Sequence, residues 1–119
     1  MERGNKVKIL EQKIGDVNII SLSGRLDAYS ANDLETKLHS LIDADQVQLV
    51  VNIGRLEYIS SSGLRVLLAA LKKVRKQRGD IKLACLKPYI KEVFDIAGFT
   101  QLFTIFDAEE AAVSSFGEA

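Results

Sequence analysis

Apolar and polar residues alternate near the start of the chain, and apolar residues then recur at helical spacing. Residues 7–11 and 17–23 each have the pattern of a strand, and Gly15-Asp16 between them is a common pair in tight turns. We therefore expect an antiparallel hairpin. Leucine and isoleucine then repeat three and four residues apart, which predicts a helix over residues 31–43.

The rest of the chain alternates strands with helices. Residues 47–53 are almost continuously apolar and β-branched, which is typical of a central strand that is covered on both faces and has parallel neighbours. A second apolar stretch, 56–59, leads to a run of serines, and helical spacing resumes from residue 64 to about residue 78. The remaining expected elements are strands over 81–86 and 102–106, a helix that begins at Pro88, and a final helix near the C-terminus.

Residues with capping chemistry mark the predicted helix ends. Ser30 followed by Asp33 resembles a capping box at the start of the first helix. Gly79 and Gly98 are expected to close the second and third helices, and Asp107 is expected to cap the fourth.

The resulting order, β-β-α-β-α-β-α-β-α, predicts an α/β fold with a mixed five-stranded sheet and four helices. Each strand after the hairpin is followed by a helix, so these strands are expected to pair in parallel through right-handed crossovers. A chain of 119 residues fits a single domain, 1–119, with about 5–116 folded and the termini frayed.

Charge and hydropathy exclude several classes of partner. The 16 basic and 16 acidic residues cancel, so no global field attracts the protein to nucleic acid or to an anionic membrane. Basic residues do gather between Arg65 and Lys91, but we interpret them as cations that complement a helix C-terminus. No apolar run approaches the ~20 residues that span a bilayer. We expect a cytoplasmic protein with no nucleic-acid or membrane partner.

Candidate catalytic chemistry is sparse. The single histidine, His39, is expected to be solvated on a helix flank, and the single cysteine, Cys85, to be a buried structural thiol. The glycines are dispersed, so neither a phosphate loop nor a dinucleotide fingerprint is present, and we expect no metal or cofactor. The hydroxyl-rich junction Ser60–Gly63 remains, and its place before a helix suits a cap or phosphate chemistry.

Three segments give this junction a context. Over nearly its whole length the chain resembles the STAS domain of bacterial anti-sigma factor antagonists. The resemblance rests on Ser23-Gly24-Arg25-Leu26-Asp27, Ile59-Ser60-Ser61-Ser62-Gly63-Leu64 and Phe94-Asp95-Ile96-Ala97-Gly98-Phe99.

The resemblance implies a phosphorylation site. In that family the central motif usually reads Asp-Ser-(Ser/Ala)-Gly-Leu, and a partner kinase phosphorylates its first serine, which corresponds to Ser61. The acidic position before it is Ser60 here, whereas the other acidic position near the site is retained as Asp27. Ser60 and Ser62 are alternative acceptors. The implied partner-binding surface comprises Asp27, Ser60, Ser61, Ser62, Gly63 and Arg65.

The implied function is regulatory and not enzymatic. The protein would bind an anti-sigma factor that is also a serine kinase, and phosphorylation would switch off this binding; a phosphatase is a further possible partner, and a monomer or weak dimer is expected. One alternative is a STAS docking subunit of a transporter ATPase or signalling assembly without a phosphorylation switch. Another is a small nucleotide-binding or hydrolytic protein that uses Asp27 and the start of the second helix, although no phosphate loop or base supports it.

Overall fold

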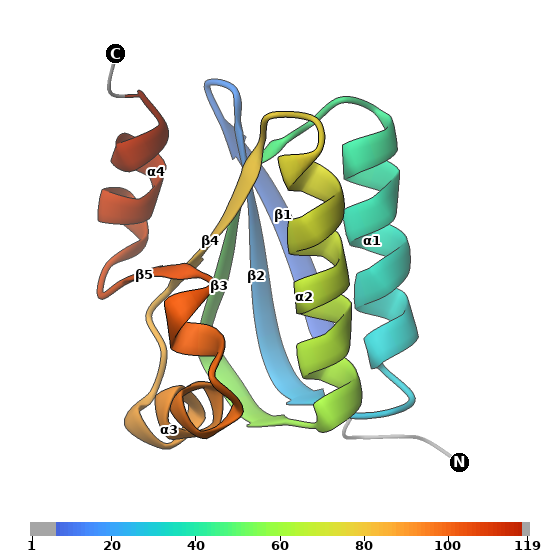
Figure 1. Ribbon diagram of the computed structural model, residues 1–119, viewed down its shortest axis with the longest axis vertical. Coiled ribbons are helices and arrows are strands. Elements are labelled where there is room, and N and C mark those ends of the chain that lie inside the picture. Colours follow the sequence, from blue (N-terminus) through green and yellow to red (C-terminus); the bar gives the residue numbers. More distant parts are fainter. Residues whose placement is uncertain (1–6, 118–119) are drawn as a thin grey trace.

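The computed structural model describes residues 7–117, which form one sheet with helices on both of its faces (Figure 1). The start of the expected folded range, at residue 5, and the tail residues 118–119 lie outside the described part. Within that part, no helix combines the length and apolar character needed to cross a bilayer. In chain order the elements are β1 (Lys8–Ile14), β2 (Val17–Leu26), α1 (Ala31–Asp43), β3 (Gln48–Ile59), α2 (Ser61–Arg75), β4 (Asp80–Ala84), α3 (Pro88–Ala97), a 3-10 turn (Phe99–Gln101), β5 (Thr104–Phe106) and α4 (Glu109–Gly117).

The sheet has the strand order β1-β2-β3-β4-β5, and the predicted mixed topology is confirmed. β1 and β2 form the antiparallel hairpin, in which Ile14 pairs with Val17 across the turn. The pairs β2·β3, β3·β4 and β4·β5 are all parallel. β3 is therefore central with parallel neighbours, as predicted, but it is one strand of 12 residues that includes both apolar stretches.

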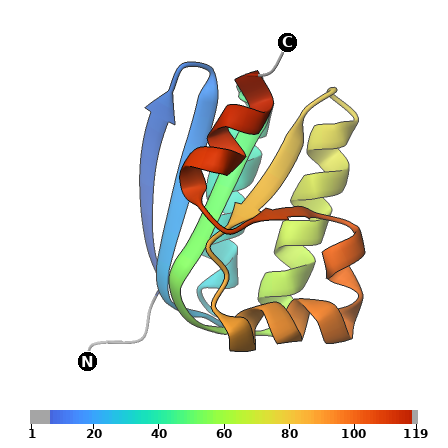
Figure 2. The ribbon, with the colours of Figure 1, turned by 90° about the vertical axis from the view of Figure 1, so that its left-hand side faces the viewer.

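The two faces of the sheet are covered unequally. α1 and α2 lie side by side on one face, and α3 and the 3-10 turn close the same core beside them. On the opposite face, α4 packs against β3, β4 and β5, and Ala112 joins Val17, Ile19, Val50 and Ala84 in a smaller core. Figure 2 shows this face, with the hairpin β1–β2 extending beyond α4.

Two predicted helix ends differ in the structure. Ser30 precedes α1, but its side chain makes no cap hydrogen bond to that helix; its hydroxyl instead donates to the carbonyl oxygen of Arg25 at 2.7 Å. α2 ends at Arg75, and the left-handed residue after it is Arg78 (φ 66°), while Gly79 packs closely against Val47, just before β3. The predicted role of Gly98 is confirmed, because it ends α3 with φ 81°.

The predictions for the start of α4, for the single cysteine and for the single histidine also differ from the structure. α4 begins at Glu109, which places Asp107 two residues ahead of it and leaves Ala108 at the preceding position. Cys85 is only half-buried, since the chain turns at the end of β4 with a left-handed φ of 67° there. His39 does lie on the flank of α1, but it is half-buried against α2: its Nδ1 lies 3.4 Å from Lys73 Nζ and its Nε2 is buried.

Candidate functional site

The serine junction lies where β3 passes into α2, at the carboxyl ends of the parallel strands. Ser60 has an extended backbone (φ −91°, ψ 170°), and its Oγ accepts a hydrogen bond from the backbone N–H of Gly63 at 3.1 Å. Ser60 is thus the N-cap of α2, and it satisfies one of the backbone donors that a helix start leaves without a partner. Its own N–H donates to the carbonyl oxygen of Leu26 at 2.9 Å, which ties the junction to the end of β2.

The three serines of the junction differ in accessibility. Ser61 is the first residue of α2 and is exposed, whereas Ser60 and Ser62 are half-buried. Within residues 7–117 the hydroxyls of Ser61 and Ser62 form no hydrogen bond, while that of Ser60 is engaged as the cap. Ser61 therefore combines an uncommitted hydroxyl with the greatest exposure of the three.

Gly63 is required by the packing of α2 and not by an unusual backbone angle. A Cβ atom on Gly63 would lie 2.8 Å from Cδ2 of Leu26 and 3.1 Å from Cγ1 of Ile59. Both neighbours are buried side chains of the sheet. The absence of a side chain at position 63 lets the first turn of α2 rest directly on the ends of β2 and β3.

Asp27 shapes the loop that follows β2. Its Oδ1 accepts hydrogen bonds from the backbone N–H groups of Tyr29 and Ser30, both at 3.0 Å, and lies 3.1 Å from the Ser30 hydroxyl, whose single proton it shares with the carbonyl oxygen of Arg25. The Ser30 N–H lowers the pKa of Asp27 most, and the Ser30 hydroxyl, the Tyr29 N–H and the charge of Arg25 lower it further, against a smaller opposing effect of burial. The carboxylate is therefore ionised at neutral pH. It lies next to the serine junction, because β2 and β3 are paired up to Leu26 and Ile59.

Arg65 lines a groove between α1 and α2. It is exposed one turn after Ser61, and with Ser62 it forms the α2 side of a groove of about 330 Å³. The α1 side comes from residues that the sequence did not single out, because only the packing of two helices brings them to the serine junction. The lining residues are Ala28, Ala31, Asn32, Glu35, Ser62, Arg65, Val66 and Ala69.

The electrostatics of α2 favour an anion at its start. No acidic residue occupies its first turn, so the positive end of the helix dipole is uncompensated by its own side chains. Basic residues at the other end are partly neutralised: Lys73 pairs with Asp43 at 2.8 Å and Arg75 with Asp80 at 3.4 Å. Among the residues that the structure describes, no group of three His, Cys, Asp or Glu side chains is placed to hold a metal ion.

Comparisons with known proteins identify the family to which this chain belongs. The STAS domain profile matches residues 8–112. The chain is 38% identical over 113 residues to BtrV of Bordetella bronchiseptica, which is named as an anti-sigma factor antagonist, and the match covers 95% of this chain and 97% of that protein. It is 31% identical to the anti-sigma-B factor antagonist of Bacillus subtilis over 87% of this chain and 94% of that one.

A solved structure shares the fold. SpoIIAA, an anti-sigma factor antagonist, superposes with a TM-score of 0.77 in its unphosphorylated form, at 21% identity over 94% of this chain and all of SpoIIAA. The phosphorylated form of SpoIIAA, from Bacillus, gives a TM-score of 0.75 at 21% identity, over 92% and 99% of the two chains. The chain therefore belongs to the STAS domain family, among the anti-sigma factor antagonists, which are regulatory proteins and not enzymes.

Proposed function

We propose that this protein binds an anti-sigma factor that is also a serine kinase, and that phosphorylation of Ser61 ends the binding. The observation that carries the proposal is the exposed, uncommitted Ser61 hydroxyl at the first position of α2, beside a Ser60 hydroxyl that is held as the cap. The names of the two relatives and the existence of a phosphorylated SpoIIAA support the same role.

The switch acts through surface charge on a rigid domain. A phosphate on Ser61 adds roughly −1.5 to −2 charges at the start of α2, where the helix dipole favours an anion. Arg65 lies four residues later on the same helix face and is placed to pair with that phosphate. The domain itself therefore tolerates the modification, whereas a partner that docks on a neutral, hydroxyl-rich surface loses its contacts.

Ser60 preserves the local structure in the absence of the usual acid. Serine and aspartate are both good N-caps, so the hydrogen bond to the Gly63 N–H is retained when one replaces the other. What changes is the charge next to Ser61: a phosphate here meets the carboxylate of Asp27 but no second carboxylate at position 60. We propose that this weakens the like-charge repulsion in the phosphorylated protein.

The partner surface combines the junction with the groove. Asp27, Ser62, Gly63 and Arg65 border the acceptor, and Glu35 gives the opposite wall of the groove a negative charge. A partner that carries small apolar and basic side chains fits this surface. We place the interaction in the cytoplasm, with this protein as a monomer or weak dimer, and a phosphatase would restore the binding state.

The test starts from the protein purified in the unphosphorylated form. The partner kinase is isolated on the tagged protein, identified, and incubated with it and ATP; mass spectrometry of the peptide that contains residues 60–62 is expected to place the phosphate on Ser61. Binding to the same partner, measured by calorimetry, is expected to weaken at least about tenfold for Ser61→Asp and to persist for Ser61→Ala. Ser40→Asp, an exposed serine on α1, is the matched control and is expected to bind normally.

Two results would separate the alternatives. A peptide that stays unmodified while the partner binds tightly favours a permanent docking subunit, of a transporter ATPase or a signalling assembly, over a switch. A phosphate found on Ser60 or Ser62 keeps the switch but moves its acceptor. Tight binding by Ser61→Asp overturns the proposed mechanism.

A further inference from the structure

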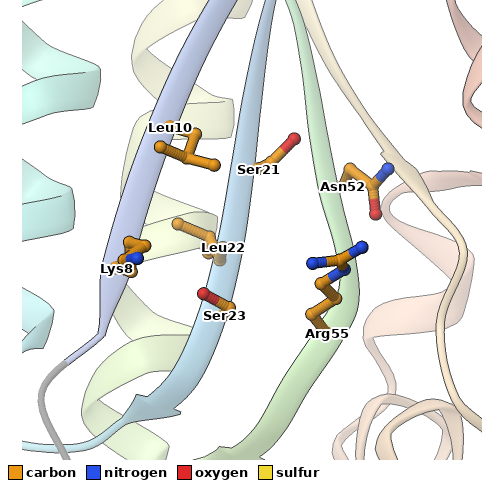
Figure 3. A pocket seen from close by; sticks show the side chains of 7 residues that line it. All are labelled: Lys8, Leu10, Ser21, Leu22, Ser23, Asn52 and Arg55. Carbon is orange, nitrogen blue, oxygen red and sulfur yellow. The ribbon is translucent and has the colours of Figure 1, made fainter.

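The sheet face opposite α1 and α2 carries a second candidate site, remote from the groove. On this face α4 covers the β3–β5 side (Figure 2). A pocket of about 420 Å³ lies open over β1, β2 and β3. Figure 3 shows the side chains that line it, on three adjacent strands. They are Lys8, Leu10, Ser21, Leu22, Ser23, Asn52 and Arg55.

The strand register arranges the pocket in two rows. Lys8 pairs with Ser23 across β1 and β2, and Ser23 pairs with Arg55 across β2 and β3, so one hydroxyl lies between two cations. Neighbouring strands are about 4.8 Å apart, which separates the two cationic residues by roughly 10 Å at the backbone. Their long side chains are able to reach one ion above the serine between them.

A β-bulge is responsible for the position of Arg55. The register moves from Ser21 opposite Asn52 to Ser23 opposite Arg55, so β3 contains one more residue than β2 between these pairs. Strict alternation from Ile53, which lies in the core beneath α1 and α2, would also turn Arg55 towards that core. The extra residue restores Leu56 to the core and leaves Arg55 on the open face.

The side-chain donors of the first row, which runs from Lys8 through Ser23 to Arg55, have no partner among the described residues. Among residues 7–117, neither Lys8 nor Arg55 has a carboxylate at ion-pair distance, and the Ser23 hydroxyl forms no hydrogen bond. The second row, in which Leu10 pairs with Ser21 and Ser21 pairs with Asn52, is different. Here Asn52 donates to Glu109 at 2.7 Å and accepts from the Gly54 N–H at 2.9 Å. The Glu109 carboxylate repels an anion from the second row, so the first row is the favourable position.

We propose that this pocket binds a small organic phosphate, with its phosphate group between Lys8 and Arg55 above Ser23. A guanidinium, an ammonium and a hydroxyl supply donors for three phosphate oxygens, and the two positive charges match a phosphate monoester dianion. The compact organic part lies along Ser21 and Leu10, whose side chain is 60% exposed. The site is separate from Ser61 and does not depend on the proposed phosphorylation switch.

Backbone amide shifts of the ¹⁵N-labelled protein test the site directly. Titration with inorganic phosphate and then with glycerol 3-phosphate is expected to produce saturable shifts at Lys8, Ser23 and Arg55. Glycerol 3-phosphate is expected to bind several-fold more tightly than inorganic phosphate because its organic part adds contacts. Arg55→Gln and Lys8→Gln are each expected to weaken binding at least about tenfold. Lys13→Gln removes the same charge from the same strand, but on the face towards α1, and is the matched control.

Each other outcome overturns a stated part of the proposal. Shifts confined to Ser61–Gly63 would show that phosphate prefers the start of α2. Equal weakening by Lys13→Gln would show a non-specific charge effect, and equal affinity for the two probes would overturn the assignment of an organic ligand. The amide spectrum of each variant without ligand verifies its fold, and Arg55→Lys, which retains the charge, is expected to recover part of the affinity lost in Arg55→Gln.

Discussion

Gly63 and Leu26 are in such close contact that the first turn of α2 has no room for a side chain at position 63. A Cβ atom there would lie 2.8 Å from Cδ2 and 2.9 Å from Cγ of Leu26, a side chain that is fully buried at the end of β2. This contact sets the distance between the loop after β2 and the start of α2. It therefore holds Asp27 and Ser61, which lie on these two segments, close together at the carboxyl ends of β2 and β3.

Gly63→Ala is expected to destabilise the protein by up to about 2 kcal/mol. The added methyl group overpacks the junction at a cost of roughly 1–3 kcal/mol, and the better helix propensity of alanine, about 1 kcal/mol, offsets part of it. The free energy of unfolding from urea titration measures the change. Gly117→Ala is the control, because a Cβ there meets nothing within 4 Å; a Gly63→Ala variant as stable as this control would contradict the packing argument.

Ser60→Ala is expected to cost about 1 kcal/mol, because the N–H of Gly63 loses its partner. Ser60→Asp retains an acceptor and adds a negative charge at the positive end of α2, so its stability is expected to equal or exceed that of the unchanged protein. Ser61→Ala removes a hydroxyl without a hydrogen bond among the described residues and should change stability by less than about 0.5 kcal/mol. Urea titration of the three variants checks this order, and an equal loss in Ser60→Ala and Ser61→Ala would contradict the assignment of the cap.

Asp27→Asn is expected to lower stability at neutral pH and to have little effect in acid. The pKa of Asp27 is lower in the folded protein than its ordinary value of 3.8, chiefly through the Ser30 N–H. A carboxyl with a depressed folded-state pKa stabilises the fold above the unfolded-state pKa, and this contribution is lost as the pH falls through the folded-state value. Unfolding free energies of both proteins at about pH 7 and about pH 2.5 measure it. A gap between the two proteins that persists unchanged in acid would rule out the charge as its cause.

Arg78→Gly is expected to stabilise the protein by about 0.5–1 kcal/mol. Arg78 has φ 66°, a region in which a residue with a Cβ atom is strained and glycine is not. Gly79→Ala is expected to have the opposite effect, since its Cβ would collide with the backbone oxygen of Val47. The melting temperatures of the two single variants test the contrast, and a stable Gly79→Ala protein would contradict it.

The sequence alone determined most of the secondary structure, because the relevant interactions are local. The alternation before and after Gly15, the leucine repeat of α1 and the Pro88–Gly98 limits of α3 all depend on residues within a few positions of one another. The same holds for the serine junction, where hydroxyls directly precede a helical pattern. The prediction of its capping role is confirmed for Ser60, and the role of Ser61 as phosphate acceptor stays a prediction.

Tertiary structure decided the features that depend on contacts between distant segments. The sequence pointed to Gly79 as the helix terminator, but the left-handed angle belongs to Arg78, and Gly79 instead leaves room for Val47 in the connection before β3. His39 is half-buried because α2 lies beside α1, and no pattern within α1 reports the position of its neighbour.

The two candidate binding surfaces show the same division. The resemblance to a known family pointed to Ser61 and Arg65, but Glu35 joins them only because α1 and α2 lie side by side on one face of the sheet. Likewise, the row from Lys8 to Arg55 exists only because three strands pair in one register with a bulge in β3. Periodicity along the chain assigns a residue to a helix or a strand, whereas the partner across a sheet or between helices depends on interactions between residues far apart in sequence.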